Sequence, residues 1–261
     1  MLAVDYYAHH NRFRQIHPAE KLLLAGGCLA LTLCSPQVLV SWETVGLMVL
    51  LTLAGARIPG RLYGRLLLLP LSFLLPAALT AVLRVSLSPT QSLWSFSLGT
   101  LYFGLGAAEA RQALVLISRS LAAVSCLYFL SLTTPVAEIL AVFRRLGVPV
   151  ALLELMSIVY RSLFVLWQTA HSIYLSQSAR QGYANASASR RSLGVLAVNL
   201  FTKANRYSHL SYLALLSRGY QGSLILPEVS RSLSWRNVLL IAITEVALYL
   251  VGLVAGGAGI G

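Results

Sequence analysis

The stretch LLLLPLSFLLPAALTAVL, residues 66–83, decides the fold class of this chain. Its 18 residues carry no charge, and an arginine stands at each end, Arg65 and Arg84. Eighteen or more consecutive apolar residues are long enough to cross the hydrocarbon core of a bilayer as a helix. Two internal prolines, Pro70 and Pro76, are tolerated in membrane helices because neighbouring helices and waters satisfy the freed backbone groups. We therefore predict a membrane-spanning helix here.

The composition extends this prediction from one helix to most of the chain. Of the 261 residues, 57% are hydrophobic and only 11% are charged, whereas a soluble domain carries about 25% charged residues. Such a chain has too little polar surface to cover a water-facing exterior, so lipid must supply much of its solvent. The net charge of +12 does not indicate nucleic-acid binding, because the basic residues stand between apolar runs rather than on one face.

The apolar runs predict an all-α, polytopic membrane helix bundle of about five spans. An N-terminal transmembrane bundle covers 1–132, and a C-terminal transmembrane helix with its tail covers 236–261. Within the bundle, the predicted spans lie near 20–34, 37–55, 65–84 and 111–132. Residues 85–106, rich in Ser, Gly and aromatic residues, are expected to form an interfacial excursion or a re-entrant turn.

Charge places the remaining segment, 133–235, which we predict to be a long cytoplasmic helical coupling insert between the last two spans. Eleven of the twenty Lys and Arg residues lie within 134–236, and basic loops stay on the cytoplasmic side. The apolar run 150–167 is read as membrane-apposed, because crossing there would place Arg180, Arg190 and Arg191 outside. The same rule puts the N-terminus in the cytoplasm.

Helix signals divide the insert into three helices. Thr134 and Pro135 suit a helix start, and Gly147 suits the position after a helix end. A second helix is predicted from Pro149 to about Arg180, and a third from about Leu193 to Ser217. The segment between them, GYANASASRR (182–191), is predicted to be a loop of small residues.

The two long helices end alike, and this is the feature that points to function. The second closes with Ala179-Arg180-Gln181 and the third with Ser217-Arg218-Gly219. An arginine near a helix C-terminus can simply complement the helix dipole, an effect of about 0.3–1 kcal/mol. A repeated arginine at two helix ends also offers two five-donor forks to the carboxylates of a partner.

These patterns resemble one family over nearly the whole chain: the transmembrane T component of energy-coupling-factor (ECF) transporters, in its cobalt-type branch, CbiQ. The N-terminal matches are Asp5, Ala8, His17-Pro18 and Lys21, and the insert matches at Thr133-Thr134-Pro135, Arg145-Leu146-Gly147-Val148-Pro149 and Tyr160-Arg161. The two tripeptides resemble the family's paired Ala-Arg-Gly signatures, with Gln181 replacing a glycine and Ser217 replacing an alanine.

The resemblance implies a non-catalytic coupling subunit of an ECF-type ABC importer in a bacterial or archaeal cell membrane. Both arginine tripeptides would contact two cytoplasmic ABC ATPase subunits, and Glu154 and Arg161 would make further contacts along the coupling helices. The motion would reach a metal-binding, CbiM-like membrane S component, with a small auxiliary membrane subunit in some systems. Cobalt is the expected cargo, nickel the next candidate and a vitamin the third. ATP and Mg²⁺ would be bound and hydrolysed by the partners, so this chain is expected to hold no cofactor.

No catalytic motif accompanies these features. The sequence contains no Walker-type phosphate loop, HExxH, CxxC or nucleophile elbow, so an enzyme is not expected. The N-terminal histidines His9, His10 and His17 are weak metal candidates, since only Asp5 stands near them, and a membrane-surface or partner-contacting segment is preferred. The alternative function is a self-sufficient secondary transporter, disfavoured by the absence of broken-helix inverted repeats.

Two kinds of residue inside the apolar runs are expected to serve packing. Arg119 should face the bundle and pair with Glu109, Glu43 or a backbone carbonyl, because an unpaired charge in the membrane is expensive. The three cysteines, Cys28, Cys34 and Cys126, are read as small packing or lipid-facing residues, since their spacing matches no metal site or disulfide framework.

Overall fold

The computed structural model of the chain describes residues 3–35, 37–86, 94–98, 101–105, 107–220 and 233–257. The chain forms two compact units. One, called here the bundle unit, contains Leu2–Ile139 and Val229–Gly261, and the other, the hairpin unit, contains Leu140–Glu228.

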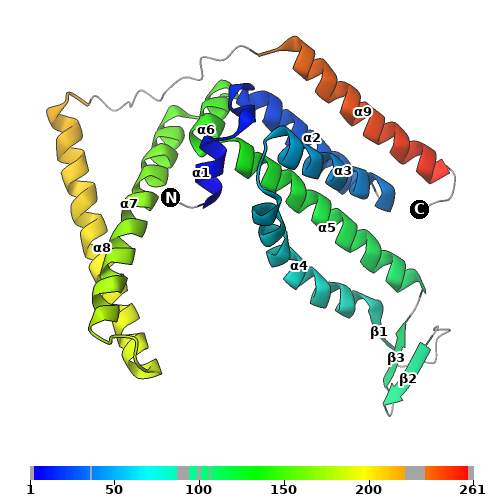
Figure 1. The fold of residues 1–261 in the computed structure, drawn as a ribbon, viewed down its shortest axis with the longest axis horizontal. Coiled ribbons are helices and arrows are strands. Elements are labelled where there is room, and N and C mark those ends of the chain that lie inside the picture. The colour runs from blue at the N-terminus through cyan, green and yellow to red at the C-terminus, as the bar shows by residue number, and fades with distance from the viewer. Residues whose placement is uncertain are drawn as a thin grey trace. The chain divides into compact units, whose positions relative to one another are not determined.

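The bundle unit is built around one long helix, α5 (Ala107–Thr133), against which the helices that precede it in sequence are packed (Figure 1). Its other helical elements are α1 (Ala3–His9), η1 (Arg12–Gln15), α2 (Pro18–Cys34), α3 (Val38–Leu50) with its π-helical extension η2 (Leu51–Gly55), α4 (Gly60–Val82) and α9 (Trp235–Gly257). Helix α9, far away in sequence, packs on α2 and α3.

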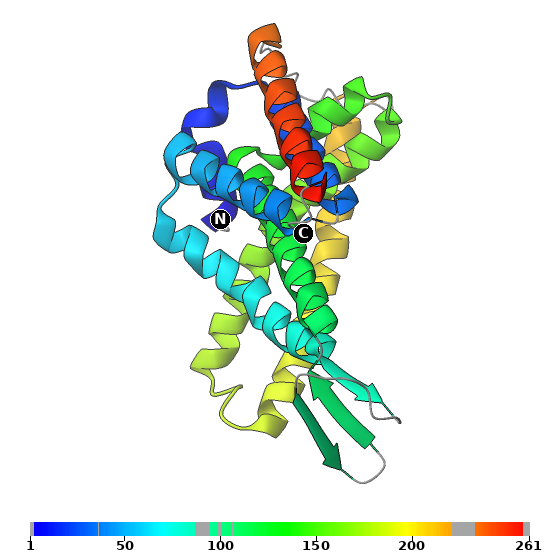
Figure 2. The same ribbon diagram turned by 90° about the vertical axis from the view of Figure 1, so that its right-hand side faces the viewer.

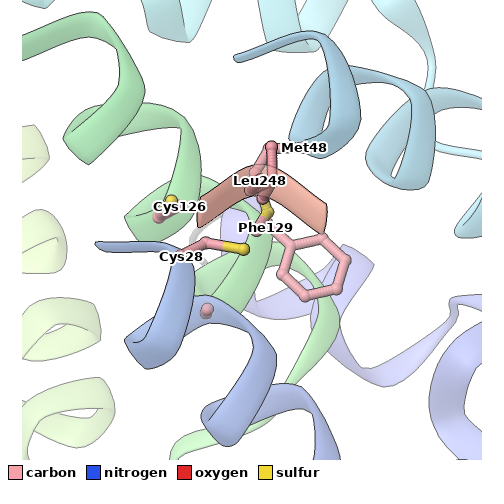
Figure 3. Packing of buried hydrophobic residues seen from close by; sticks show 6 residues of the cluster. Cys28, Met48, Cys126, Phe129 and Leu248 are labelled. Atoms are coloured by element: carbon pink, nitrogen blue, oxygen red, sulfur yellow. The ribbon is translucent and has the colours of Figure 1, made fainter. Parts of the chain in front are cut away.

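A cluster of buried side chains, three of them sulfur-containing, joins four helices of the bundle unit (Figure 3). Cys28 of α2, Met48 of α3, Cys126 and Phe129 of α5, and Leu248 of α9 meet there. Small residues let membrane helices approach closely, which matters because burial against lipid-like surroundings provides little driving force. The prediction that cysteines pack is confirmed for Cys28 and Cys126, which are 0% and 1% exposed.

Four buried threonine hydroxyls of the bundle unit are satisfied by carbonyl groups one helical turn earlier. The hydroxyls of Thr32, Thr44, Thr52 and Thr133 each donate to the carbonyl four residues earlier, over 2.6–2.8 Å. Because a membrane interior offers no water to satisfy them, polar groups there must find partners in the protein. The threonines are therefore compatible with membrane-spanning helices.

A small antiparallel sheet connects α4 to α5 (Figure 2). Its strands are β1 (Leu83–Ser86), β2 (Trp94–Leu98) and β3 (Leu101–Leu105), with β3 in the middle. Val85 of β1 and Phe96 of β2 both pair with Phe103 of β3. From the sequence we expect an interfacial excursion or a re-entrant turn here and no strands, and the predicted span 65–84 extends two residues beyond the end of α4 at Val82. The reason is that pairing of β1 with β3 depends on contacts distant in sequence.

Five helical segments are long and apolar enough to cross a membrane: Val38–Gly55, Gly60–Thr80, Arg111–Thr133, Val150–Ala179 and Trp235–Gly252. The predicted class, a polytopic membrane helix bundle, is confirmed. This set of five segments differs from the predicted spans at one place. The predicted span near 20–34 is absent, because α2 has 17 residues and is only about 26 Å long. The helix Val150–Ala179, predicted to be cytoplasmic, is long and apolar enough to be included. Length and composition do not place that helix relative to a bilayer, so its cytoplasmic location stays a prediction.

The hairpin unit consists of two long helices, α7 (Val150–Ala179) and α8 (Ala186–Ser217), preceded by α6 (Val136–Arg145), which begins in the bundle unit. Gly147 ends α6 with a φ of 83°, as predicted. The predicted start of α8 at Leu193 is wrong. The helix begins seven residues earlier, at Ala186, so most of the predicted loop 182–191 is helical. Asn185 caps this start, and its Oδ1 accepts a hydrogen bond of 2.8 Å from the Ala188 amide. The Ala, Ser and Arg residues that follow favour helix once it is capped.

Candidate docking site

The turn of the α7–α8 hairpin is fixed by side-chain hydrogen bonds. Gln177 Nε2 donates to the Ser192 carbonyl over 3.0 Å, and Gln177 Oε1 accepts from the Tyr183 hydroxyl over 2.8 Å. Ser192 Oγ donates to the Gly182 carbonyl over 2.7 Å. The rings of Tyr174 and Tyr183 lie 4.8 Å apart between centroids. These contacts hold the end of α7 against the start of α8, so the two helices run antiparallel.

The two arginine-bearing helix ends have the same backbone conformation. Arg180 caps α7 with φ −95° and ψ 18°, and Arg218 caps α8 with φ −94° and ψ 11°. The next residue lies in the left-handed region in both cases, Gln181 at φ 57° and Gly219 at φ 75°. Both guanidinium groups therefore leave their helices from an equivalent position.

The hydrogen bonds at the two ends also correspond one to one. The amide two residues past the arginine donates to the carbonyl three residues before it, over 2.8 Å in α7 and 3.1 Å in α8. The amide one residue past the arginine donates to the carbonyl two residues before it, over 3.0 Å at both ends. This pair of bonds defines the Schellman motif. The repeat seen in the sequence is thus a repeat of structure.

Gln181 keeps this geometry although it replaces the glycine of the family signature. The left-handed conformation costs a residue with a side chain about 1–2 kcal/mol, whereas glycine adopts it freely. The second departure, Ser217, is the last residue of α8, and its hydroxyl donates to the Ala214 carbonyl over 3.0 Å. Neither departure alters the backbone that carries the arginine.

Helices α7 and α8 run antiparallel (Figure 1), so their C-terminal caps, Arg180 and Arg218, lie at opposite ends of the hairpin. Arg180 is at the turn, where α7 meets α8. Arg218 lies at the far end of α8, whose 32 residues correspond to about 48 Å of helix. Both side chains are exposed. The structure therefore keeps the two tripeptides apart by about the length of α8. Their contact with ATPase subunits stays a prediction.

A groove between α7 and α8 adjoins Arg180. Its volume is about 330 Å³, and its lining residues are Ser172, Ile173, Ser176, Gln177, Arg180, Val195, Asn199 and Lys203. Two of them are cations and none is acidic. From residue 155 to residue 220 the chain carries seven Lys and Arg residues and no Asp or Glu. Glu154, near the start of α7, is buried, so beyond it the hairpin contains no carboxylate to neutralise these cations, which favours an acidic binding partner.

Apolar side chains on the hairpin are exposed to an unusual degree. No residue of α8 is buried, and Phe201 and Val198 are 75% and 66% exposed. On α7, Trp167 is 61% exposed. Apolar surface of this extent marks a contact with protein or lipid.

The two predicted contact residues near the start of α7 differ in environment. Glu154 is 5% exposed, whereas Arg161 is exposed. They lie on one side of α7, seven residues and therefore about two turns apart. Their role in coupling stays a prediction.

Arg119 takes one of the three arrangements expected for it. Its Nε and Nη2 donate to the Ser35 carbonyl over 3.1 and 2.6 Å. Ser35 caps the C-terminal end of α2, where a cation complements the helix dipole. The prediction of a pairing with a backbone carbonyl is confirmed.

The N-terminal histidines each have a local contact. His17 is 2% exposed and caps α2, its Nδ1 accepting a hydrogen bond of 3.1 Å from the Ala19 amide. His9 Nδ1 lies 2.9 Å from the Asp5 carbonyl oxygen, and the ring of His10 stacks on Tyr6. Among the described residues, no group of three His, Cys, Asp or Glu side chains is arranged to hold a metal ion.

Sequence reasoning missed three polar residues that the bundle unit uses. Asn11 and Glu20 are 8% and 1% exposed and make hydrogen bonds to distant segments. Glu245 lies in the middle of α9, with its carboxyl group against Gly27 of α2. A charged residue within an apolar helix was the signal available for Glu245, since such residues are rare unless they have a role.

The fold defines a multi-pass helical membrane protein with a basic helical hairpin inserted before its last long apolar helix. A family model described as "Cobalt transport protein" (CbiQ) matches residues 10–228, and the chain belongs to this family. It is 29% identical to the cobalt transport protein CbiQ of Rhodobacter capsulatus over 222 residues, 85% of this chain and 86% of the relative. It is 28% identical to an uncharacterized protein of Methanocaldococcus jannaschii over 94% of this chain and 90% of that protein.

A third relative is longer. The chain is 29% identical to a putative fused cobalt transport protein CbiMQ of Methanocorpusculum labreanum over 86% of its own length, but this match spans only 37% of the relative.

Proposed function

We propose that this chain is the non-catalytic transmembrane coupling subunit of an ECF-type ABC importer for cobalt. Membership of the cobalt transport family supports the cargo. The observation that carries the coupling role is the pair of identical helix ends, each presenting an exposed arginine, on a hairpin without acidic residues between 155 and 220.

In this proposal, Arg180 and Arg218 each enter a groove on one of two cytoplasmic ABC ATPase subunits. A guanidinium group presents a planar set of donors that matches a carboxylate, and the rigid Schellman turn behind it holds its direction. When the ATPases bind and hydrolyse ATP with Mg²⁺, they move relative to each other. Because α8 lies between the two arginines and α7 packs against α8, this motion changes the position of both helices.

In this proposal the substrate is bound by a separate membrane protein rather than by this chain. The printed name of the fused relative, CbiMQ, supports a CbiM-like partner that acts as the metal-binding S component. A small auxiliary membrane subunit is a further candidate partner. This arrangement requires the hairpin unit and the N-terminus to face the cytoplasm, consistent with the basic residues of 134–236 and the positive-inside rule.

The test is co-purification with the ABC ATPase, together with uptake of radioactive Co²⁺ by the reconstituted complex. Truncating one side of a buried charge pair costs about 2–5 kcal/mol, so Arg180→Glu with Arg218→Glu should weaken ATPase binding by more than about 30-fold. The matched control is Arg191→Glu with Arg206→Glu, two exposed arginines of α8 away from its end. It makes the same change in net charge and should leave the complex intact.

Two results would overturn the proposal. If the Arg180 and Arg218 double variant keeps its ATPase and supports uptake, the arginines are not the docking residues. If the chain alone transports Co²⁺ into liposomes without ATP, it is a secondary transporter.

A further inference from the structure

Two consecutive residues at the start of α2 hold the two segments through which the chain enters and leaves the hairpin unit. Glu20 and Lys21 are 1% and 3% exposed. They belong to the first turn of α2, whose N-terminus is capped by His17. Neither has a place in the docking site described above.

Lys21 holds the segment that leads into the hairpin unit. Its Nζ donates to the carbonyl of Thr133 over 2.9 Å. Thr133 is the last residue of α5 and precedes Ile139, the last bundle residue before the chain enters the hairpin unit, by six positions. Asn11 Nδ2 donates to the same carbonyl over 3.2 Å and to that of Leu132 over 3.3 Å.

Glu20 holds the segment that returns from the hairpin unit. Its Oε1 accepts from the Ser234 amide over 2.8 Å, and its Oε2 accepts from Asn237 Nδ2 over 2.7 Å. Both donors lie at the start of α9, where a carboxylate satisfies free amides and complements the helix dipole. Ser234 follows Val229, the first bundle residue after the hairpin unit, by five positions.

We propose that Glu20 and Lys21 are positioning residues that transmit motion of the hairpin unit to α2 and hence to the bundle unit. This inference rests on the proposed coupling function. Coupling is carried by hydrogen-bond networks and rigid helices, and both are present here. The bonds involve charged groups and are shielded from water, so they are short and strong, and water does not readily replace them. A displacement at either crossing acts on one helix, because the two anchoring residues are neighbours in α2.

The test separates transmission from simple anchoring by measuring uptake per ATP hydrolysed. The complete complex is reconstituted in liposomes with Glu20→Ala or Lys21→Met, and both Co²⁺ uptake and ATP hydrolysis are followed. We expect ATP hydrolysis within about twofold of the unaltered complex and uptake per ATP lower by about 2- to 30-fold, the range that mutations in coupling networks produce. The matched control is Thr32→Val, which removes a fully buried hydroxyl from the same helix. This hydroxyl donates to Cys28 within α2 and to Thr44 of α3, not to the two segments that Glu20 and Lys21 hold.

Milder variants keep the test decisive if the first two do not assemble. Glu20→Gln and Lys21→Arg retain hydrogen-bonding capacity. Uptake per ATP in Lys21→Arg should equal that of the unaltered complex. In Glu20→Gln, which loses the charge, it should stay below that level. The inference would be overturned if Glu20→Ala and Lys21→Met left uptake per ATP unchanged. If the complexes with these two variants do not assemble, an unchanged uptake per ATP in Glu20→Gln would overturn it instead. The proposed function fails separately, if the Arg180 and Arg218 double variant still binds the ATPase.

Discussion

Gln181 offers a sharp test of the claim that the two helix ends are the same structure. It is a residue with a side chain at φ 57°, at the position where the other end has Gly219 at φ 75°. Gln181→Gly removes a conformational cost of about 1–2 kcal/mol, and about 0.5–1 kcal/mol of this is lost to the greater freedom of glycine in the unfolded chain. The variant should stabilise the end of α7 by about 0.5–1 kcal/mol, which corresponds to a 2- to 5-fold change in a local opening equilibrium.

The reciprocal change at the other end isolates the backbone contribution. A Cβ atom added to Gly219 would meet no atom within 4 Å, so Gly219→Ala tests conformation without a steric clash. It should destabilise the end of α8 by about 0.5–1 kcal/mol. Gly194 lies inside α8, where an added Cβ also meets nothing within 4 Å. Gly194→Ala is the control and should not weaken the helix.

Amide hydrogen exchange measures these effects at the atoms concerned. The amides of Gly182 and Tyr220 close the two Schellman turns. Exchange at Gly182 should slow by about 2- to 5-fold in Gln181→Gly, and exchange at Tyr220 should accelerate by a similar factor in Gly219→Ala. Faster exchange at Gly182 in Gln181→Gly would show that the backbone there is not left-handed, and the equivalence of the two ends would be refuted.

Two further predictions concern the groove and the core. Lys203→Glu, which reverses a charge lining the groove, should weaken binding of the ATPase more than Arg206→Glu does; equal effects in a binding titration would mean that only net charge matters. Gly27→Ala places a methyl group on the Glu245 carboxyl, whereas the Cβ of Gly26→Ala meets nothing within 4 Å. In thermal unfolding in detergent, Gly27→Ala should therefore cost about 1 kcal/mol and Gly26→Ala should gain up to about 1 kcal/mol; equal shifts would contradict the packing described here.

The features predicted correctly depend on interactions local in sequence. Membrane character follows from the hydropathy of continuous runs such as 66–83. Helix ends could be predicted at Gly147, Arg180 and Arg218 because the hydrogen bonds that end a helix join residues only a few positions apart.

The errors have equally physical causes. The apolar residues from Leu193 predict too late a start for α8, because Asn185 caps the helix earlier and the exposed Ala, Ser and Arg residues that follow continue it. The three strands around Phe103 were missed because one of their two ladders joins β1 to β3, which are distant in sequence. Strand formation depends more on such partners than on intrinsic preference.

By itself, the sequence determined that this is a helical membrane protein with two matched arginine ends, since hydropathy and helix capping are local properties. Only the tertiary structure showed that those ends lie at opposite ends of one antiparallel hairpin. It alone showed that Glu20 and Lys21 hold residues 214 and 112 positions away. A buried charge needs a partner, but its sequence neighbours do not reveal which distant backbone group the fold will bring to it.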